Sequence, residues 1–246
     1  MEDMEVYYIY RPRTFYMNPI LILAAVIPAV LLLLYVYKAD KLEKEPKGLL
    51  GILILQGILS TALAVFTERI GTRVLGWFFS ENTWIYQIIF NFLVVGLSEE
   101  GFKYLLLKRR TWTSSYFNCQ FDGVVYAVFV SLGFALWENI DYVVMFGFQT
   151  ALVRAVTAIP GHACFGVFMG AWYGLAKAHE RHGHGENSAM CRKFAVICPV
   201  LLHGLYDLIA TVDQTERAVY FVGFIALMFL AAYSMIRRLS RQDKYF

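Results

Sequence analysis

The chain has 246 residues, of which 59% are hydrophobic, 17% aromatic and 17% charged, and its mean hydropathy is +0.52. Soluble domains are usually about 45–50% apolar and about 25% charged, so this composition excludes an ordinary soluble domain and indicates a polytopic membrane protein. The net charge of only +3 provides no excess of positive charge that would favour binding to nucleic acid.

Apolar segments that are long enough to cross a bilayer recur along most of the chain. They predict an all-α bundle of about seven transmembrane helices. No internal repeat or low-complexity linker interrupts them, so we expect a single membrane domain over residues 1–246. The predicted spans cover residues 18–37, 48–67, 84–107, 121–146, 151–175, 194–211 and 217–236.

Basic residues are unevenly distributed between the loops that join these spans. One side of the membrane receives Arg11, Arg13, Arg69, Arg73, Arg154 and Arg217. The other side receives many more: Lys38, Lys41, Lys44, Lys47, Lys108, Arg109, Arg110, Lys177, Arg181, Arg192, Lys193, Arg237, Arg238, Arg241 and Lys244. The positive-inside rule therefore predicts that residues 1–17 are extracytoplasmic and that residues 237–246 form a cytoplasmic tail.

The third predicted span carries three charged residues inside an apolar run: Glu99, Glu100 and Lys103. Each such charge costs at least ~2.5 kcal/mol at the centre of a bilayer, so their presence needs a reason. Glu99 precedes Lys103 by four positions and Glu100 precedes it by three, which allows both carboxylates to pair with the amine on one helix face. Taken alone, the three residues fit a structural ion pair as well as a functional site.

Three further spans carry ionisable residues at comparable depth. The fourth has Glu138 beside Asn139, the fifth has His162, and the sixth has His203 and Asp207. The i,i+4 spacing of His203 and Asp207 lets the carboxylate orient the imidazole, or lets both reach one ion. A lone histidine in a membrane helix is often only an interhelical hydrogen-bonding partner. Because four different spans carry such groups, we predict that they converge on one polar site.

Small residues indicate which helix faces pack closely. They recur every four positions on the face that carries His162 and on one face of the fourth span: Gly166, Gly170 and Gly174, and Gly123, Ala127, Ser131 and Ala135. Such patterns allow helices to approach closely, so the ionisable groups are expected to face other helices and not lipid. Pro160-Gly161 is expected to break or kink the fifth helix just before His162.

The polar motifs occur in a fixed order, each on its own predicted span: Glu99-Glu100-x-x-Lys103, Phe134-x-x-x-Glu138-Asn139, His162, and His203-x-x-x-Asp207. This ordered set, within a likeness that runs from about Gly48 to the end of the chain, resembles the PrsW family of intramembrane proteases. It is similar, more distantly, to the CAAX-processing and bacteriocin-processing membrane endopeptidases. Glu138 stands where the CAAX-processing enzymes usually have His, and Asp207 where they usually have Asn; both fit PrsW.

The resemblance implies a multi-pass protease of the bacterial plasma membrane that cuts another membrane protein at or near the bilayer. In the best-known case the substrate is a single-pass anti-sigma factor, and the cut starts a regulated cascade. The resemblance therefore implies a membrane-protein substrate and the lipid bilayer as partners. It leaves the substrate of this chain open.

Peptide hydrolysis needs a group that takes a proton from water. We assign this general base to Glu100 or Glu99, because the paired carboxylates lie at the depth of both histidines. Lys103 opposes the effect of burial on their proton affinity. Together with Asn139, these residues form the predicted catalytic set.

The remaining polar groups allow two mechanisms. In the first, a zinc ion is held by two histidines and one or two carboxylates: Glu138, His162, His203 and Asp207. Two histidines and one carboxylate are a common catalytic zinc set, and the acidic character of the cluster favours a cation. In the metal-free alternative, a glutamate protease, His162 orients the water while His203 and Asp207 bind the developing oxyanion or the leaving group.

Two other classes of function fit part of the pattern. A proton-coupled transporter also places carboxylates and histidines at the midplane beside a broken helix, although the chain shows no inverted repeat. A non-catalytic membrane scaffold would keep the same polar network for packing alone.

Overall fold

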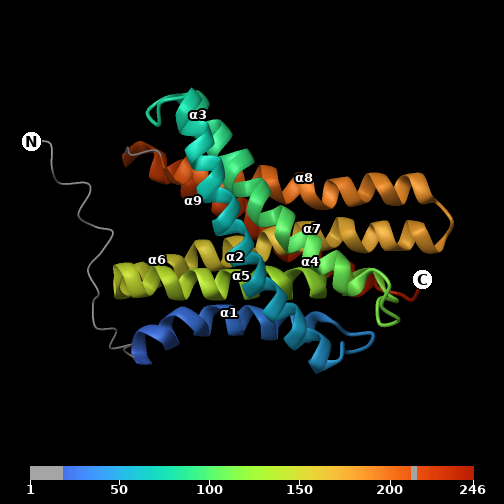
Figure 1. Ribbon diagram of the computed structural model, residues 1–246. Helices are drawn as coiled ribbons and strands as arrows, with labels where there is room; N and C mark the ends of the chain where they lie inside the picture. Colours follow the sequence, from blue (N-terminus) through green and yellow to red (C-terminus); the bar gives the residue numbers. More distant parts are fainter. Residues whose placement is uncertain (1–18, 212–214) are drawn as a thin grey trace, which may run out of the picture.

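The computed structural model describes residues 19–211 and 215–246, and helices account for nearly all of this part of the chain (Figure 1). The predicted extracytoplasmic segment 1–17 lies outside the described residues. The helical elements, in chain order, are α1 (Pro19–Ala39), α2 (Lys47–Phe78), α3 (Trp84–Ile89), η1 (Phe90–Gly96), α4 (Leu97–Thr111), α5 (Gln120–Phe146), α6 (Phe148–Val156), α7 (Ala158–Arg181), α8 (Gly185–Ala210) and α9 (Thr215–Gln242).

The all-α membrane bundle predicted from the sequence is confirmed. Within the described residues, six helical segments are long and apolar enough to cross a membrane: Pro19–Ala39, Lys47–Phe78, Gln120–Phe146, Phe148–Arg181, Gly185–Ala210 and Ala218–Gln242. The remaining predicted span, 84–107, corresponds to a helical run from Trp84 to Thr111 that a π-helical turn, η1, divides into α3 and α4. Neither α3 nor α4 alone reaches spanning length.

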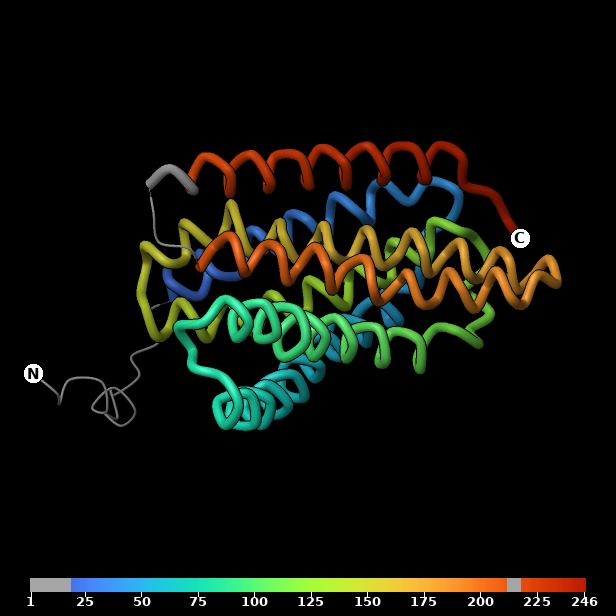
Figure 2. Tube along the Cα trace, turned by 90° about the horizontal axis from the view of Figure 1, so that it is seen from above, coloured from blue at the N-terminus to red at the C-terminus, as the bar shows by residue number. Residues whose placement is uncertain are grey.

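Helix α5 forms the centre of the bundle. In its most apolar stretch, 78% of the residues are buried, compared with 17% for α1. Figure 1 shows the axes of α1, α5, α7 and α8 lying side by side, with α7 and α8 antiparallel and α2 and α4 crossing them obliquely. From above, α9 lies along one side of the bundle and α4 along the other, with α7 and α8 between them (Figure 2). The most enclosed helix thus lies among the helices that carry the predicted polar residues.

The predicted stripes of small residues bring α5 and α7 together. A side-chain carbon on Gly123 would lie 2.6 Å from the backbone nitrogen of Gly174, and one on Gly166 would lie 2.9 Å from Cα of Val128. Ser131 on α5 also donates a hydrogen bond of 2.6 Å to the carbonyl oxygen of His162 on α7. This close packing fixes the position of His162 relative to α5.

Two local predictions need correction. The second helix continues to Phe78 and not to residue 67, so Arg69 and Arg73 lie within α2 and not in a loop. The break expected at Pro160 occurs at Thr157, where α6 ends and α7 begins. A proline ring clashes with the carbonyl group four residues earlier, which here belongs to Val156, and proline is well tolerated in the first turn of a helix. The interruption therefore comes about one turn earlier than we expected.

Candidate active site

The structure brings the polar residues of four helices into one buried cluster. Helix α4 contributes Glu99, Glu100 and Lys103 from its N-terminal half, directly after the π-helical turn. Glu138 comes from α5, His162 from α7, and His203 and Asp207 from α8. These residues are linked by contacts of hydrogen-bond length: Lys103–Glu100, Lys103–His162, His203–Glu100, His162–Glu138 and His203–Asp207.

Lys103 lies at the centre of this cluster and is fully buried. Its Nζ is 2.7 Å from Glu100 Oε1, 3.2 Å from Glu99 Oε2 and 3.1 Å from His162 Nδ1. The amine also lies 3.9 Å from the centre of the Phe134 ring, a cation–π distance. Lys103 therefore neutralises part of the negative charge and connects the two glutamates of α4 to the histidine of α7.

The two histidine rings are nearly perpendicular, with their centres 5.3 Å apart. Nδ1 of His203 is 3.0 Å from Glu100 Oε1, and Nδ1 of His162 faces Lys103. The opposite nitrogens face outer carboxylates: His162 Nε2 is 3.0 Å from Glu138 Oε2, and His203 Nε2 is 3.3 Å from Asp207 Oδ2. Each imidazole is thus held between the centre of the cluster and a carboxylate outside it, an arrangement that fixes ring orientation.

The same residues offer a set of ligands that fits a metal ion. One donor atom from each of Glu99, Glu100, His162 and His203 lies within 4.8 Å of the others. Imidazole nitrogens and carboxylate oxygens are the donors that catalytic zinc sites use. Glu100 Oε2 is buried and has no hydrogen-bond partner in the described part of the chain, so one carboxylate oxygen remains available. This grouping differs from the set predicted from the sequence, because Glu138 and Asp207 lie on the far side of the imidazoles.

Asn139, which we predicted to be catalytic, lies beside this cluster and is fully buried. Its Nδ2 donates a hydrogen bond of 2.9 Å to the carbonyl oxygen of Ala25 on α1. Its Oδ1 accepts a hydrogen bond of 2.9 Å from Nε of Arg154. In this arrangement Asn139 joins α1, α5 and α6.

Two charged residues next to the cluster were not predicted from the sequence. Arg154 on α6, counted there as a loop residue, donates through Nη2 to Glu138 Oε2 at 2.7 Å. Glu68 on α2 lies close enough to interact electrostatically with Glu138, His203 and Lys103, and its Oε1 is buried. The position of Glu68 continues the buried face of α2, made by Gly57, Thr61 and Ala64, and this spacing is the signal that could have revealed it.

Comparisons with known proteins point to one family. A model of the PrsW family, described as an intramembrane metalloprotease family, matches residues 45–233. The chain is 30% identical over 227 residues to the Protease PrsW of Halalkalibacterium halodurans, covering 91% of this chain and 99% of that protein. It is 32% identical over 222 residues to the Protease PrsW of Shouchella clausii, covering 90% and 97% of the two chains. It is 32% identical over 191 residues to that of Bacillus subtilis, covering 78% and 83%. No solved structure gives a significant match.

Proposed function

Because the chain belongs to the PrsW family of intramembrane proteases, we propose that its buried Glu/His cluster hydrolyses a peptide bond of a membrane-protein substrate. The contacts of Glu100 are the observation that carries this proposal. One of its carboxylate oxygens is held by Lys103 and His203, at 2.7 and 3.0 Å. The other is buried and free of hydrogen-bond donors among the described residues. A carboxylate fixed in this way is suited to accept a proton from an attacking water.

Glu100 is therefore the proposed general base. Peptide hydrolysis requires that the proton taken from water be returned to the nitrogen of the departing amine, and the same carboxyl group can deliver it. Lys103 keeps Glu100 in place through its ion pair and offsets the charge of Glu99, which it contacts at 3.2 Å. The protein thus has one base that is held in position, Glu100, and a neighbouring carboxylate, Glu99, that can take another role.

We assign that second role to metal binding. His162, His203 and Glu99 would hold a zinc ion, since their donor atoms lie close together and match the preferences of zinc. When bound, zinc makes a water easier to deprotonate and polarises a peptide carbonyl. Glu138 and Asp207 then act as orienting partners of the two imidazoles, through the contacts at Nε2.

The proposed substrate is a membrane protein that enters the bundle from the lipid or from the membrane surface. A single-pass anti-sigma factor, the substrate in the best-known case of this family, fits this description. The site supports a membrane substrate because its residues are buried among helices that are apolar enough to span a bilayer.

Substrate trapping tests the activity. The Glu100→Gln variant, crosslinked in native membranes and purified in detergent, is expected to retain membrane proteins that the wild type releases as fragments. The captured proteins are then incubated with wild type, Glu100→Gln and the surface variant Glu186→Gln in liposomes. We expect cleavage by wild type and Glu186→Gln and a loss of at least ~100-fold in Glu100→Gln. Proton-coupled solute flux by wild-type protein that cleaves none of them would instead support the transporter.

Elemental analysis separates the roles of the two glutamates. Wild type and Glu100→Gln are expected to bind one zinc per chain, whereas Glu99→Gln and His203→Ala are expected to lose it. Full activity of tag-free protein without stoichiometric metal would overturn the zinc assignment and leave the metal-free glutamate protease.

A further inference from the structure

A second group of acidic side chains lies where three segments meet, well separated in sequence from the candidate active site. Asp40 and Glu45 belong to the connection between α1 and α2, Asp122 to the first turn of α5, and Asp243 to the C-terminal tail. Figure 1 shows the C-terminus beside the α4–α5 connection. The tail is held there by a hydrogen bond of 2.9 Å from the backbone nitrogen of Phe246 to a carbonyl in that connection.

Two of the four carboxylates use only one oxygen to hold the chain. Asp122 Oδ2 accepts hydrogen bonds from the backbone nitrogens of Asn118 and Cys119, at 3.0 and 2.7 Å. Asp243 Oδ1 accepts one of 3.0 Å from the backbone nitrogen of Phe121. Capping of α5 explains these two oxygens. It does not explain the second oxygens, Asp122 Oδ1 and Asp243 Oδ2, which are buried and receive no hydrogen bond from the described residues.

The other two carboxylates, Asp40 and Glu45, are 1% and 2% exposed, and no hydrogen bond of good geometry reaches them from the described part of the chain. The backbone nitrogen of Glu45 lies near Asp40, and Asp122 lies near Glu45. A tyrosine hydroxyl group beside these carboxylates is also buried. Tyr126 is fully buried, and its hydroxyl group faces Glu45 without reaching a hydrogen bond of good geometry. Buried polar groups are nearly always satisfied, so several unsatisfied oxygens in one place indicate a ligand that supplies positive charge.

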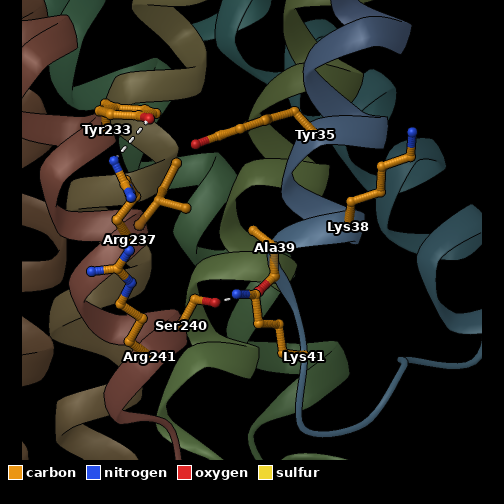
Figure 3. A pocket seen from close by; sticks show the side chains of 9 residues that line it. Tyr35, Lys38, Ala39, Lys41, Tyr233, Arg237, Ser240 and Arg241 are labelled. Atoms are coloured by element: carbon orange, nitrogen blue, oxygen red, sulfur yellow. Dashed lines mark hydrogen bonds between the residues drawn. The ribbon is translucent and has the colours of Figure 1, made fainter.

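No basic side chain of the described residues forms an ion pair with these carboxylates. Lys44 donates hydrogen bonds to backbone carbonyl oxygens, including that of Asp40, and not to the carboxylates. Burial raises the pKa of Asp40 to about 6, with Lys44 opposing the rise, and burial raises the pKa of Glu45 to about 7. The other basic side chains near the end of α1 line a separate groove between α1 and α9 (Figure 3): Lys38, Lys41, Arg237 and Arg241.

We propose that this carboxylate cluster is a second metal site, which binds a hard divalent cation of the Mg²⁺, Ca²⁺ or Mn²⁺ class. Carboxylate oxygens of Asp122 and Asp243 lie within 4.8 Å of each other, beside the Cys119 thiol, and the oxygens of Asp40 and Glu45 add to the negative charge nearby. Carboxylate oxygens are the ligands that hard cations prefer. Because these residues come from three segments, a bound cation would fasten the C-terminal tail to both connections. The site is independent of the proposed peptidase chemistry.

A titration with Mn²⁺ tests this site. Full-length protein in detergent, stripped with a chelator and studied at pH 8, is titrated while the electron paramagnetic resonance signal of free Mn²⁺ is recorded. We expect one bound equivalent that Mg²⁺ or Ca²⁺ displaces. Asp40→Asn and Asp243→Asn should each weaken binding at least tenfold, whereas the matched surface variant Glu186→Gln should bind like wild type. His203→Ala should also retain this equivalent, which separates it from metal bound at the candidate active site.

A second measurement reports on the C-terminal tail and needs only wild-type protein. Release of Phe246 by a serine carboxypeptidase should be slower with Mn²⁺ than after chelation, by at least severalfold. The proposal is overturned if the wild type binds no Mn²⁺ at millimolar concentration at pH 8. It is also overturned if the bound equivalent disappears in His203→Ala but persists in Asp243→Asn, or if Mn²⁺ leaves the release of Phe246 unchanged.

Discussion

Glu138 and Asp207 each contact Nε2 of a histidine, at 3.0 and 3.3 Å, on the side away from the centre of the cluster. If they orient the imidazoles and do not bind zinc, Glu138→Gln and Asp207→Asn should weaken zinc affinity about 10–100-fold without abolishing stoichiometric binding. His162→Ala should abolish it. Competition with a chromophoric chelator measures these affinities. Complete loss of zinc in Glu138→Gln would instead make Glu138 a ligand, as the sequence analysis assigned it.

Lys103 is the buried cation on which Glu99 and Glu100 depend. Removing one partner of a buried ion pair leaves an uncompensated charge, so Lys103→Met should lower the free energy of unfolding by about 3–5 kcal/mol. The matched variant Lys108→Met, one and a half turns further along α4 and exposed, should change it by less than ~0.5 kcal/mol. Unfolding in mixed micelles measures both. Equal stability of the two variants would contradict the central role of Lys103.

Most residues of the candidate active site were predicted from the sequence, because charged residues inside apolar runs are conspicuous. Their spacing along a helix also defines a common face. Arg154 and Glu68 were missed because they do not lie well inside an apolar run. Both lie near the ends of predicted spans, where a charge is expected at the membrane surface, so their burial depends on helix boundaries that hydropathy does not define. The pairing of each histidine nitrogen also depends on how the helices are rotated, which spacing within one helix cannot give.

The contact between α5 and α7 depends on glycines that leave no room for a side chain. An added carbon on Gly170 would overlap the backbone of Val124 and Gly123, so Gly170→Ala should lower stability by about 1–3 kcal/mol and displace His162. Gly51 on α2 has no atom within 4 Å of such a carbon, and Gly51→Ala should be neutral or stabilising because alanine favours helix. Thermal unfolding in detergent compares the two; a more stable Gly170→Ala would contradict this packing.

Helix existence and order followed from the sequence, but helix ends did not. Hydropathy falls where charges appear, so the predicted second span stopped before Glu68, whereas α2 continues to Phe78. The residues beyond 67 remain helical because one face of α2 still packs against other helices: Gly71 lies against Val94, and Leu75 is buried beside Tyr86. Contacts between helices decide where a helix ends, and the sequence of one segment does not reveal these contacts.

For the whole molecule, the predicted orientation can be tested with one pair of sites. In a variant whose native cysteines are replaced by serine, Glu81→Cys in the α2–α3 connection should react with a membrane-impermeant thiol reagent in intact cells. Glu186→Cys at the start of α8 should react only after permeabilisation, because its side of the bundle carries most of the Lys and Arg. The reverse pattern would invert the predicted orientation.

The bundle also shows why hydropathy alone does not identify its centre. Helix α1 is the most apolar span, with a hydropathy of 2.8, and it is mostly exposed, whereas the central α5 has a hydropathy of 1.5. Lipid-facing helices need apolar side chains around their circumference, while a central helix needs small residues that let its neighbours approach. The small-residue stripes therefore predict the central position of α5 better than its hydropathy does.

The π-helical turn at Phe90–Gly96 sets the angular position of α3 relative to α4. A turn of this kind contains one residue more than the α-helical path would use. If the same residues formed a regular α-helix, Trp84–Ile89 would rotate by about 100° relative to Glu99 and Glu100. Tyr86, which is buried beside Leu75, and the two carboxylates of α4 would then no longer face their present neighbours at the same time. This segment is consequently the place where a change of helix type, with every side chain of the cluster intact, would be enough to misalign the cluster.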